Sequence, residues 1–182
     1  MPYDPEYQHR RSIRLKGYDY SQAGAYYITL VTHQRRYLFG DILGNDMQLN
    51  PVGKMVLREW TRLISRFPGI DLDEFIVRPD HFHGILILSA DKNGTVKHAP
   101  VSGTTSGPVL DHKPYGVTGV PLAAGSIPVI VRAFKSAAAL RYHSMANNSE
   151  PLWLRNYYEH IIRNDEDLER IRLYIAANPA KG

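Results

Sequence analysis

The chain has 182 residues, of which 43% are hydrophobic, so it is long enough for one domain with a genuine core but short for two independent domains. It contains no cysteine, which excludes a disulfide framework and a thiolate metal site, and its formal net charge of +4 suits a phosphate-bearing partner or a solvated surface. It has no apolar stretch of about 18 residues and no signal-like start, which predicts a soluble, cytoplasmic protein without membrane association.

The first part of the chain combines a basic arm with short strands. The arm covers about residues 1–20, and its positive charge is concentrated in Arg10, Arg11, Arg14 and Lys16. Ala25 to Thr32 is a run of β-branched and aromatic residues, which predicts a first strand. A second strand is expected around Tyr37 to Leu43, and a turn at Gly44 to Asp46 leads into Met47 to Asn50.

A helix and a hairpin come next. Apolar residues recur at helical spacing from Val52 to Phe67, and Pro51 suits the first turn of that helix. Asp71 to Val77 and residues 81–88 then predict two strands joined by the turn Arg78-Pro79-Asp80. A hairpin of this kind is antiparallel.

The second strand of this hairpin carries the most informative pattern in the chain, Asp80-His81-Phe82-His83-Gly84, at the head of an apolar run. Residues two apart in a strand lie on the same face, so both imidazoles could bind one metal ion, whereas Phe82 points the opposite way and is buried. The alternative is that His81 and His83 are ordinary surface or half-buried residues, since histidine is intermediate in its burial. Because cysteine is absent, nitrogen and oxygen atoms must supply all ligands of any metal.

The rest of the chain is predicted to be a long loop followed by a helix, a strand and a helix. Proline and glycine alternate from about residue 89 to 127 while large apolar residues are scarce, which predicts a loop. We expect a helix from Ile127 to Met145, a strand from Leu152 to Ile162 and a last helix over residues 165–178, with Asn164 as its N-cap. The order of elements predicts an α+β fold, a ferredoxin-like antiparallel sheet with helices packed on one face.

The last helix places Tyr174 and Asn178 one turn apart, so that their side chains share a face. An apolar stripe beside them, which would dock the helix on the sheet, consists of Leu168, Ile171 and Ile175. The alternative interpretation is structural, because a tyrosine on an amphipathic helix is commonly half-buried and asparagine before proline commonly ends a helix.

In this combination the chain resembles the HUH single-tyrosine transposases, and among them the REP-associated tyrosine transposases, which act on palindromic repeats. The resemblance runs from about residue 10 to 179 and rests on an ordered set of motifs: Arg11 to Tyr20, His81-Phe82-His83, Phe134-Lys135-Ser136, Trp153 with Tyr157 to His160, and Tyr174 with Asn178. It implies a single transposase domain over residues 1–182 of the HUH endonuclease type. The implied activity is that of a metal-dependent endonuclease and strand transferase for single-stranded DNA.

The resemblance also implies a role for each motif residue. His81, His83 and Asn178 would hold a divalent metal, Mg²⁺ or Mn²⁺, that acts as a Lewis acid. Ligand chemistry alone leaves the ion open, since Zn²⁺ fits two imidazoles at least as well. Tyr174 would attack the scissile phosphodiester, leaving a covalent 5′-phosphotyrosine and a free 3′ hydroxyl. Three other tyrosines are rival nucleophiles: Tyr142, Tyr157 and Tyr158.

The expected partner is single-stranded DNA beside a hairpin, because exposed bases can stack on aromatic side chains. Basic residues are the expected phosphate contacts: Arg10, Arg11, Arg14 and Lys16 in the arm and, secondarily, Arg132 and Lys135. Solubility is the alternative role for all of them. Two other functions stay open: a phosphodiester hydrolase that needs the metal but not Tyr174, and a hairpin-binding protein that needs neither. The chain could act as a monomer or as a homodimer.

Overall fold

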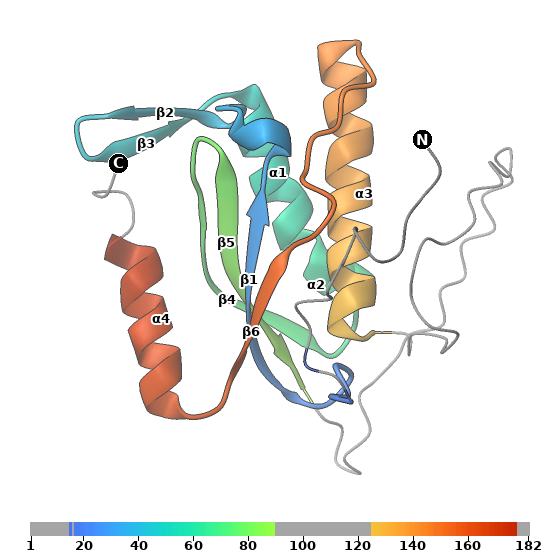
Figure 1. Ribbon diagram of the computed structural model, residues 1–182, viewed down its shortest axis with the longest axis vertical. Helices are drawn as coiled ribbons and strands as arrows, with labels where there is room; N and C mark the ends of the chain where they lie inside the picture. Colours follow the sequence, from blue (N-terminus) through green and yellow to red (C-terminus); the bar gives the residue numbers. More distant parts are fainter. Residues whose placement is uncertain (1–14, 16, 90–124, 178–182) are drawn as a thin grey trace, which may run out of the picture.

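The computed structural model describes residues 15, 17–89 and 125–177 (Figure 1). Most of the basic arm, most of the segment predicted as a proline- and glycine-rich loop, and the residues after Ala177 lie outside this part of the chain. Among the described helices, none combines the length and the apolar character that crossing a membrane requires.

The main sheet has four antiparallel strands in the order β4-β5-β1-β6. Their bounds are β1 (Gly24–Val31), β4 (Ile70–Val77), β5 (His81–Leu88) and β6 (Tyr158–Ile162). Helices follow β1 and β5 in the chain, so the elements of this sheet read β-α-β-β-α-β, which is the ferredoxin-like order. The α+β fold and the antiparallel pairing of β4 with β5 are therefore confirmed.

A separate two-stranded sheet follows β1. Its strands are β2 (Gly40–Leu43) and β3 (Asp46–Leu49). The strand predicted from Tyr37 begins later than expected, because the backbone N–H groups of Leu38 and Phe39 both donate to the carbonyl of Pro79 instead of pairing with a strand. These contacts tie the β2–β3 hairpin to the turn between β4 and β5.

The main core lies between one face of the sheet and three helices. These are α1 (Pro51–Thr61), α2 (Leu63–Arg66) and α3 (Ile127–Ala146). Phe82 of β5 is fully buried there, as predicted, with its ring centroid 4.6 Å from that of Trp60 on α1. Trp60 also lies 5.2 Å from Phe134 of α3, so an aromatic cluster joins both helices to the sheet. Burial of one such side chain contributes about 1.5–3 kcal/mol to stability.

The start of α1 follows the sequence pattern and its end does not. The side-chain oxygen of Asn50 accepts a hydrogen bond from the N–H of Gly53, and Pro51 occupies the first turn, as predicted. The single helix predicted from Val52 to Phe67 is interrupted at Arg62, where ψ is −13° instead of the roughly −42° of a regular helix. The segment therefore forms two helices.

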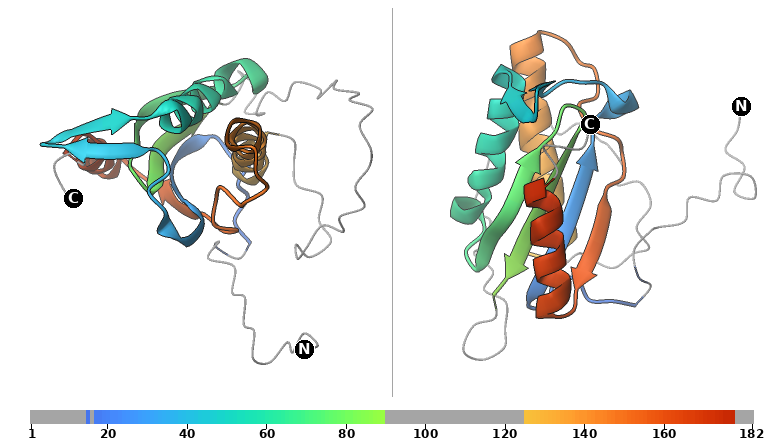
Figure 2. Two further views of the ribbon diagram at one scale, coloured as in Figure 1. Left: turned by 90° about the horizontal axis from the view of Figure 1, so that it is seen from above. Right: turned by 90° about the vertical axis from the view of Figure 1, so that its left-hand side faces the viewer.

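One detail of the expected arrangement differs, because α4 (Asp165–Ala177) packs on the opposite face of the sheet from the other helices (Figure 2). Ile171 and Ile175 form a second, smaller core with Ile85 of β5 and Ile162 of β6. Successive side chains of a strand point to opposite faces, so an apolar strand such as β5 offers two faces to cover. The helices cover both faces of the sheet instead of one.

The strand predicted from Leu152 to Ile162 is interrupted in its first half. Tyr158 pairs with Thr29, and Trp153 bridges to Thr32. Five steps along this segment therefore span three steps along its partner, and the residues between Trp153 and Tyr158 loop out. Only the second half of the prediction forms β6.

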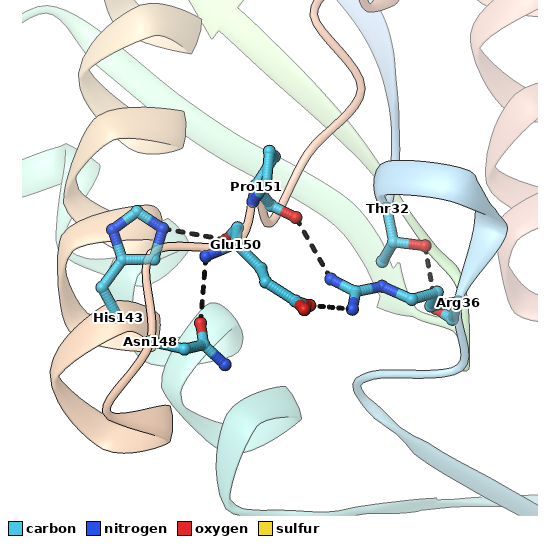
Figure 3. Close-up of polar contacts among 6 residues, drawn as sticks. All are labelled: Thr32, Arg36, His143, Asn148, Glu150 and Pro151. Carbon is cyan, nitrogen blue, oxygen red and sulfur yellow. Dashed lines mark hydrogen bonds and ion pairs between the residues drawn. The ribbon is translucent and has the colours of Figure 1, made fainter.

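Polar contacts hold this loop and the residues that precede it. The ammonium group of Lys135 on α3 donates to two backbone carbonyl oxygens of the loop at 2.7 and 2.9 Å. Arg36 pairs with the carboxylate of Glu150 and also donates to the carbonyl of Pro151 at 3.4 Å (Figure 3). These contacts fix an irregular path past the end of β1, where a continuous strand was expected.

Gly84 follows the histidine pair and permits the close approach of the aromatic cluster. A Cβ atom at Gly84 would lie 2.6 Å from Cζ2 of Trp60 and 2.9 Å from the ring of Phe82. We expect Gly84→Ala to lower the free energy of unfolding, measured with urea, by about 1–2 kcal/mol, since the overpacking outweighs the entropy gained by replacing glycine. Trp60→Phe removes the nearest of these obstructing atoms, Cζ2 of Trp60, so the double variant should lose less stability than the two single losses added together. Strict additivity would contradict this account.

Candidate functional site

His81 and His83 lie side by side on the face of β5 that turns toward α4, with ring centroids 4.7 Å apart. The side chain of His83 is only 5% exposed. Its Nδ1 atom lies 2.7 Å from the hydroxyl of Tyr27 and 2.9 Å from that of Thr29, both on β1. Its Nε2 atom is buried and has no hydrogen-bond partner among the described residues.

The surroundings of His83 suit a neutral imidazole that serves as a metal ligand. Burial lowers the pKa of His83 to about 3, with smaller contributions from the charges of His81 and Arg78. The ring is therefore uncharged at neutral pH. When its Nδ1–H donates to Tyr27 or Thr29, Nε2 carries the free lone pair that a metal requires. A buried nitrogen without a partner is costly in an apolar site, and a bound cation would satisfy it.

His81 is oriented in a comparable way by an acidic neighbour. Its Nδ1 atom is hydrogen-bonded to the carboxylate of Asp80, which also pairs with Arg35 at 3.5 Å. Arg35 and the preceding Gln34 have φ values of 53° and 57°, a region that costs energy for residues other than glycine. The short turn after β1 thus holds an arginine close to the histidine pair.

Tyr174 of α4 reaches the same place from the other side. Its ring centroid lies 5.6 Å from that of His83 and 6.4 Å from that of Tyr27. The side chain is 50% exposed, so substrate can reach it. The structure therefore brings together Tyr174 and the two histidines, which are far apart in the sequence.

The rival tyrosines are placed differently. Tyr142 is buried among the core residues of the other face of the sheet. Tyr158 is exposed and lies on β6 opposite Thr29, which is itself opposite His83, so a whole strand separates it from the imidazoles. Tyr157 packs against the main core. Among these tyrosines and Tyr174, the structure shows a ring contact with His83 only for Tyr174.

Polar contacts at both ends of α4 fix the position of Tyr174. Near its start, the side chain of Asn164 accepts a hydrogen bond from the N–H of Asp167, which makes it the predicted N-cap. Two nitrogens of the Arg172 guanidinium donate to the carboxylate of Asp73 on β4, at 3.0 and 2.5 Å. This pair anchors the turn of the helix that carries Tyr174 to the sheet.

The Asp73 ion pair makes part of the stability depend on pH. Hydrogen bonding to Arg172 lowers the pKa of Asp73, so the folded protein holds this carboxylate more strongly ionised than the unfolded chain does. The stabilisation is complete above the ordinary aspartate pKa of about 3.9 and disappears as the pH falls through the lower folded value. We expect Asp73→Asn to be destabilised in urea unfolding at pH 7, and its deficit to shrink below about pH 4. A deficit that stays constant down to pH 3 would refute the assignment.

Some predicted site residues are not described. Asn178 lies outside the described residues, as do four basic residues of the arm: Arg10, Arg11, Arg14 and Lys16. The described part of the chain holds no group of three His, Cys, Asp or Glu side chains that could bind a metal. A third protein ligand for a metal at the histidine pair would therefore have to come from another residue type or from the rest of the chain.

The basic residues of α3 lie on the opposite face of the sheet from the histidines. Arg132 is exposed, whereas Lys135 has two of its donors engaged with backbone carbonyls, and burial lowers the pKa of Lys135 to about 8. Sequence reasoning missed the residues that orient the histidines: Tyr27, Thr29 and Asp80. Tyr27 and Thr29 alternate within the predicted first strand, but only the strand order shows that they face His83.

Comparison with known proteins identifies one relative along nearly the whole chain. An uncharacterized protein of Haemophilus influenzae strain Rd is 38% identical over 180 residues, which cover 97% of this chain and 92% of that protein. No protein-family model matches this chain.

A solved structure shares the fold. It is the structure of a REP-associated tyrosine transposase bound to a REP hairpin, and it is 17% identical to this chain with a TM-score of 0.57. The match covers 93% of this chain and 74% of the transposase chain. The fold expected from the sequence, that of an HUH tyrosine transposase, is thus confirmed.

Proposed function

We propose that this chain, which belongs to the same family as the Haemophilus influenzae protein and has the fold of a tyrosine transposase, cuts and rejoins single-stranded DNA next to hairpins. The observation that carries the proposal is the position of Tyr174 beside the histidine pair, with the Nε2 atom of His83 lacking a described partner. A nucleophile and an incomplete metal site in contact are what phosphodiester cleavage through a protein-bound intermediate requires.

The reaction assigns a separate task to each side chain. A divalent metal, Mg²⁺ or Mn²⁺, held by His81, His83 and the amide oxygen of Asn178, supplies Lewis-acid polarisation of the scissile phosphate when bound. The hydroxyl oxygen of Tyr174 forms a bond to phosphorus, and the bond from phosphorus to the 3′ oxygen breaks. The phenol loses its proton and the 3′ oxygen gains one, which leaves a 5′-phosphotyrosine and a 3′ hydroxyl. Attack of a 3′ hydroxyl on this ester reverses the step and joins DNA.

Hairpin DNA is the proposed partner because the solved relative is bound to a hairpin. Phosphate contacts are assigned to basic side chains, whose affinity for DNA falls as salt rises. The arm supplies Arg10, Arg11, Arg14 and Lys16, and α3 supplies the exposed Arg132 as a further candidate. In this scheme the basic arm binds the phosphates of the hairpin, and the single strand next to the hairpin binds at the histidine pair and Tyr174.

A denaturing gel tests the proposal. The protein is incubated with a labelled DNA hairpin that has single-stranded flanks, with Mg²⁺, with Mn²⁺, or with EDTA. A denaturant-resistant protein–DNA adduct that needs the metal supports the transposase. Cut DNA without an adduct identifies a hydrolase instead, and bound but uncut DNA identifies a hairpin-binding protein. Either of these two results overturns the proposed function.

A further inference from the structure

A pocket of about 420 Å³ opens on the side of His81 that faces the β2–β3 hairpin. It lies between β2, with the segment leading into it, and the turn that joins β4 to β5. Its lining includes Tyr37, Asp41, Ile42, Arg78, Asp80 and His81. Ligand pockets of about 300–1,000 Å³ hold small molecules, so this one has room for a single nucleobase and not for a duplex.

The lining combines an exposed aromatic ring with a carboxylate that can accept hydrogen bonds. Tyr37 is 74% exposed, which is unusual for a large aromatic side chain and leaves its ring free to stack. The carboxylate of Asp41 makes no hydrogen bond or ion pair with any described residue. Arg78 also lines the pocket, and it is 4% exposed. A carboxylate acceptor beside a flat apolar ring matches the edge and the face of a base.

The charges of the lining favour a base over a phosphate inside the pocket. The lining has two carboxylates, those of Asp41 and Asp80, and one guanidinium, that of Arg78, so the negative charges outnumber the positive one and disfavour a phosphate there. The exposed guanidinium of Arg35 lies 3.5 Å from Asp80, so a cation for the phosphate is available outside, next to the lining. A nucleotide can therefore place its base within the pocket and its phosphate beside Arg35.

We infer that this pocket binds the base of a nucleotide adjacent to the scissile phosphate, with the base stacked on Tyr37 and an amino group donating to Asp41. The position of that nucleotide rests on the proposed function, because His81 belongs both to the pocket and to the proposed metal site. A carboxylate accepts hydrogen bonds from exocyclic amino groups, so adenine, cytosine or guanine is bound in preference to thymine. The pocket thereby selects where the strand is cut.

The test is a scan of abasic sites along the single-stranded flank of a hairpin. Fluorescence anisotropy measures the Kd of the protein for each DNA, and the adduct formed by the wild-type protein maps the cut. Removing the base that fills the pocket is expected to weaken binding by about tenfold at one position next to the cut. Tyr37→Ala should weaken binding of intact DNA by a similar factor. The Kd of this variant should then be the same for intact DNA and for DNA with the abasic site at that position.

Two variants complete the design. Leu43→Ala changes an exposed apolar residue of β2 that does not line the pocket, so it should show the wild-type response at every position. Asp41→Asn gives the pocket an amide that donates as well as accepts, so it should reduce the discrimination against thymine at the same position.

The outcomes separate this inference from the proposed function. If the adduct forms but Tyr37→Ala responds to every abasic site as the wild type does, the pocket does not hold a base. If no adduct forms but Tyr37→Ala abolishes the effect of one abasic site on binding, the pocket does hold a base and the cleavage proposal fails. A coupled base distant from the mapped cut, or an absence of DNA binding, overturns the inference.

Discussion

Tyr174→Phe is expected to reduce formation of the covalent protein–DNA adduct by about 10⁴-fold or more, which amounts to complete loss on a gel. The substitution removes only the hydroxyl group. The ring stays in contact with His83 and Tyr27, and the pair between Asp73 and Arg172 still anchors the helix. Stability in urea and affinity for hairpin DNA should therefore be unchanged, so that a lost adduct reports lost chemistry.

Tyr158→Phe is the matched control, because Tyr158 is another exposed tyrosine on the same face of the sheet. It should form the adduct at the wild-type rate. Tyr27 also has its ring next to that of His83, at 5.5 Å between centroids, but burial raises the pKa of Tyr27 to about 12 and its hydroxyl is hydrogen-bonded to His83. If Tyr174→Phe still forms the adduct and Tyr158→Phe does not, the nucleophile is on β6 and the proposed geometry is wrong.

The local sequence pattern was sufficient to predict the part of the site that lies on a single strand. The two-residue period of β5 places His81 and His83 on one face and Phe82 on the other, and all three are found so. The N-cap of α4 was equally predictable, since the side chain of Asn164 satisfies a free N–H group of the first turn wherever the helix lies in the fold.

The remainder depends on which elements become neighbours, and periodicity carries no information about that. The apolar stripe of α4 predicts that the helix docks, but not on which face of the sheet, because β5 is apolar on both faces. Tyr27 and Thr29 precede His83 by 56 and 54 residues, and they face it only because β1 pairs with β5. For the same reason, the loop between Trp153 and Tyr158 becomes visible only when this segment is paired with β1.

The contacts of His83 with β1 lead to the second large expected effect. The double variant Tyr27→Phe, Thr29→Val removes both hydroxyl groups near Nδ1 and leaves that nitrogen in an apolar site. The tautomer with the proton on Nδ1 is then no longer stabilised by a hydrogen bond. A proton on Nε2 instead occupies the position of the lone pair that a metal needs. We expect the affinity for Mn²⁺, measured by electron paramagnetic resonance without DNA, to fall about 10- to 100-fold.

The single variants separate orientation from general damage. Tyr27→Phe or Thr29→Val alone leaves Nδ1 with one hydroxyl partner, so the Mn²⁺ affinity of each single variant should fall much less than that of the double variant. Tyr26→Phe is the control, because Tyr26 lies on the same strand and donates a hydrogen bond to the carbonyl of Gln22 at 2.8 Å, but its ring is buried on the opposite face. It should cost stability and leave Mn²⁺ affinity unchanged. If the double variant binds Mn²⁺ as the wild type does, the hydroxyl groups do not set the tautomer of His83, and the histidine pair must be poised by His81 and Asp80 alone.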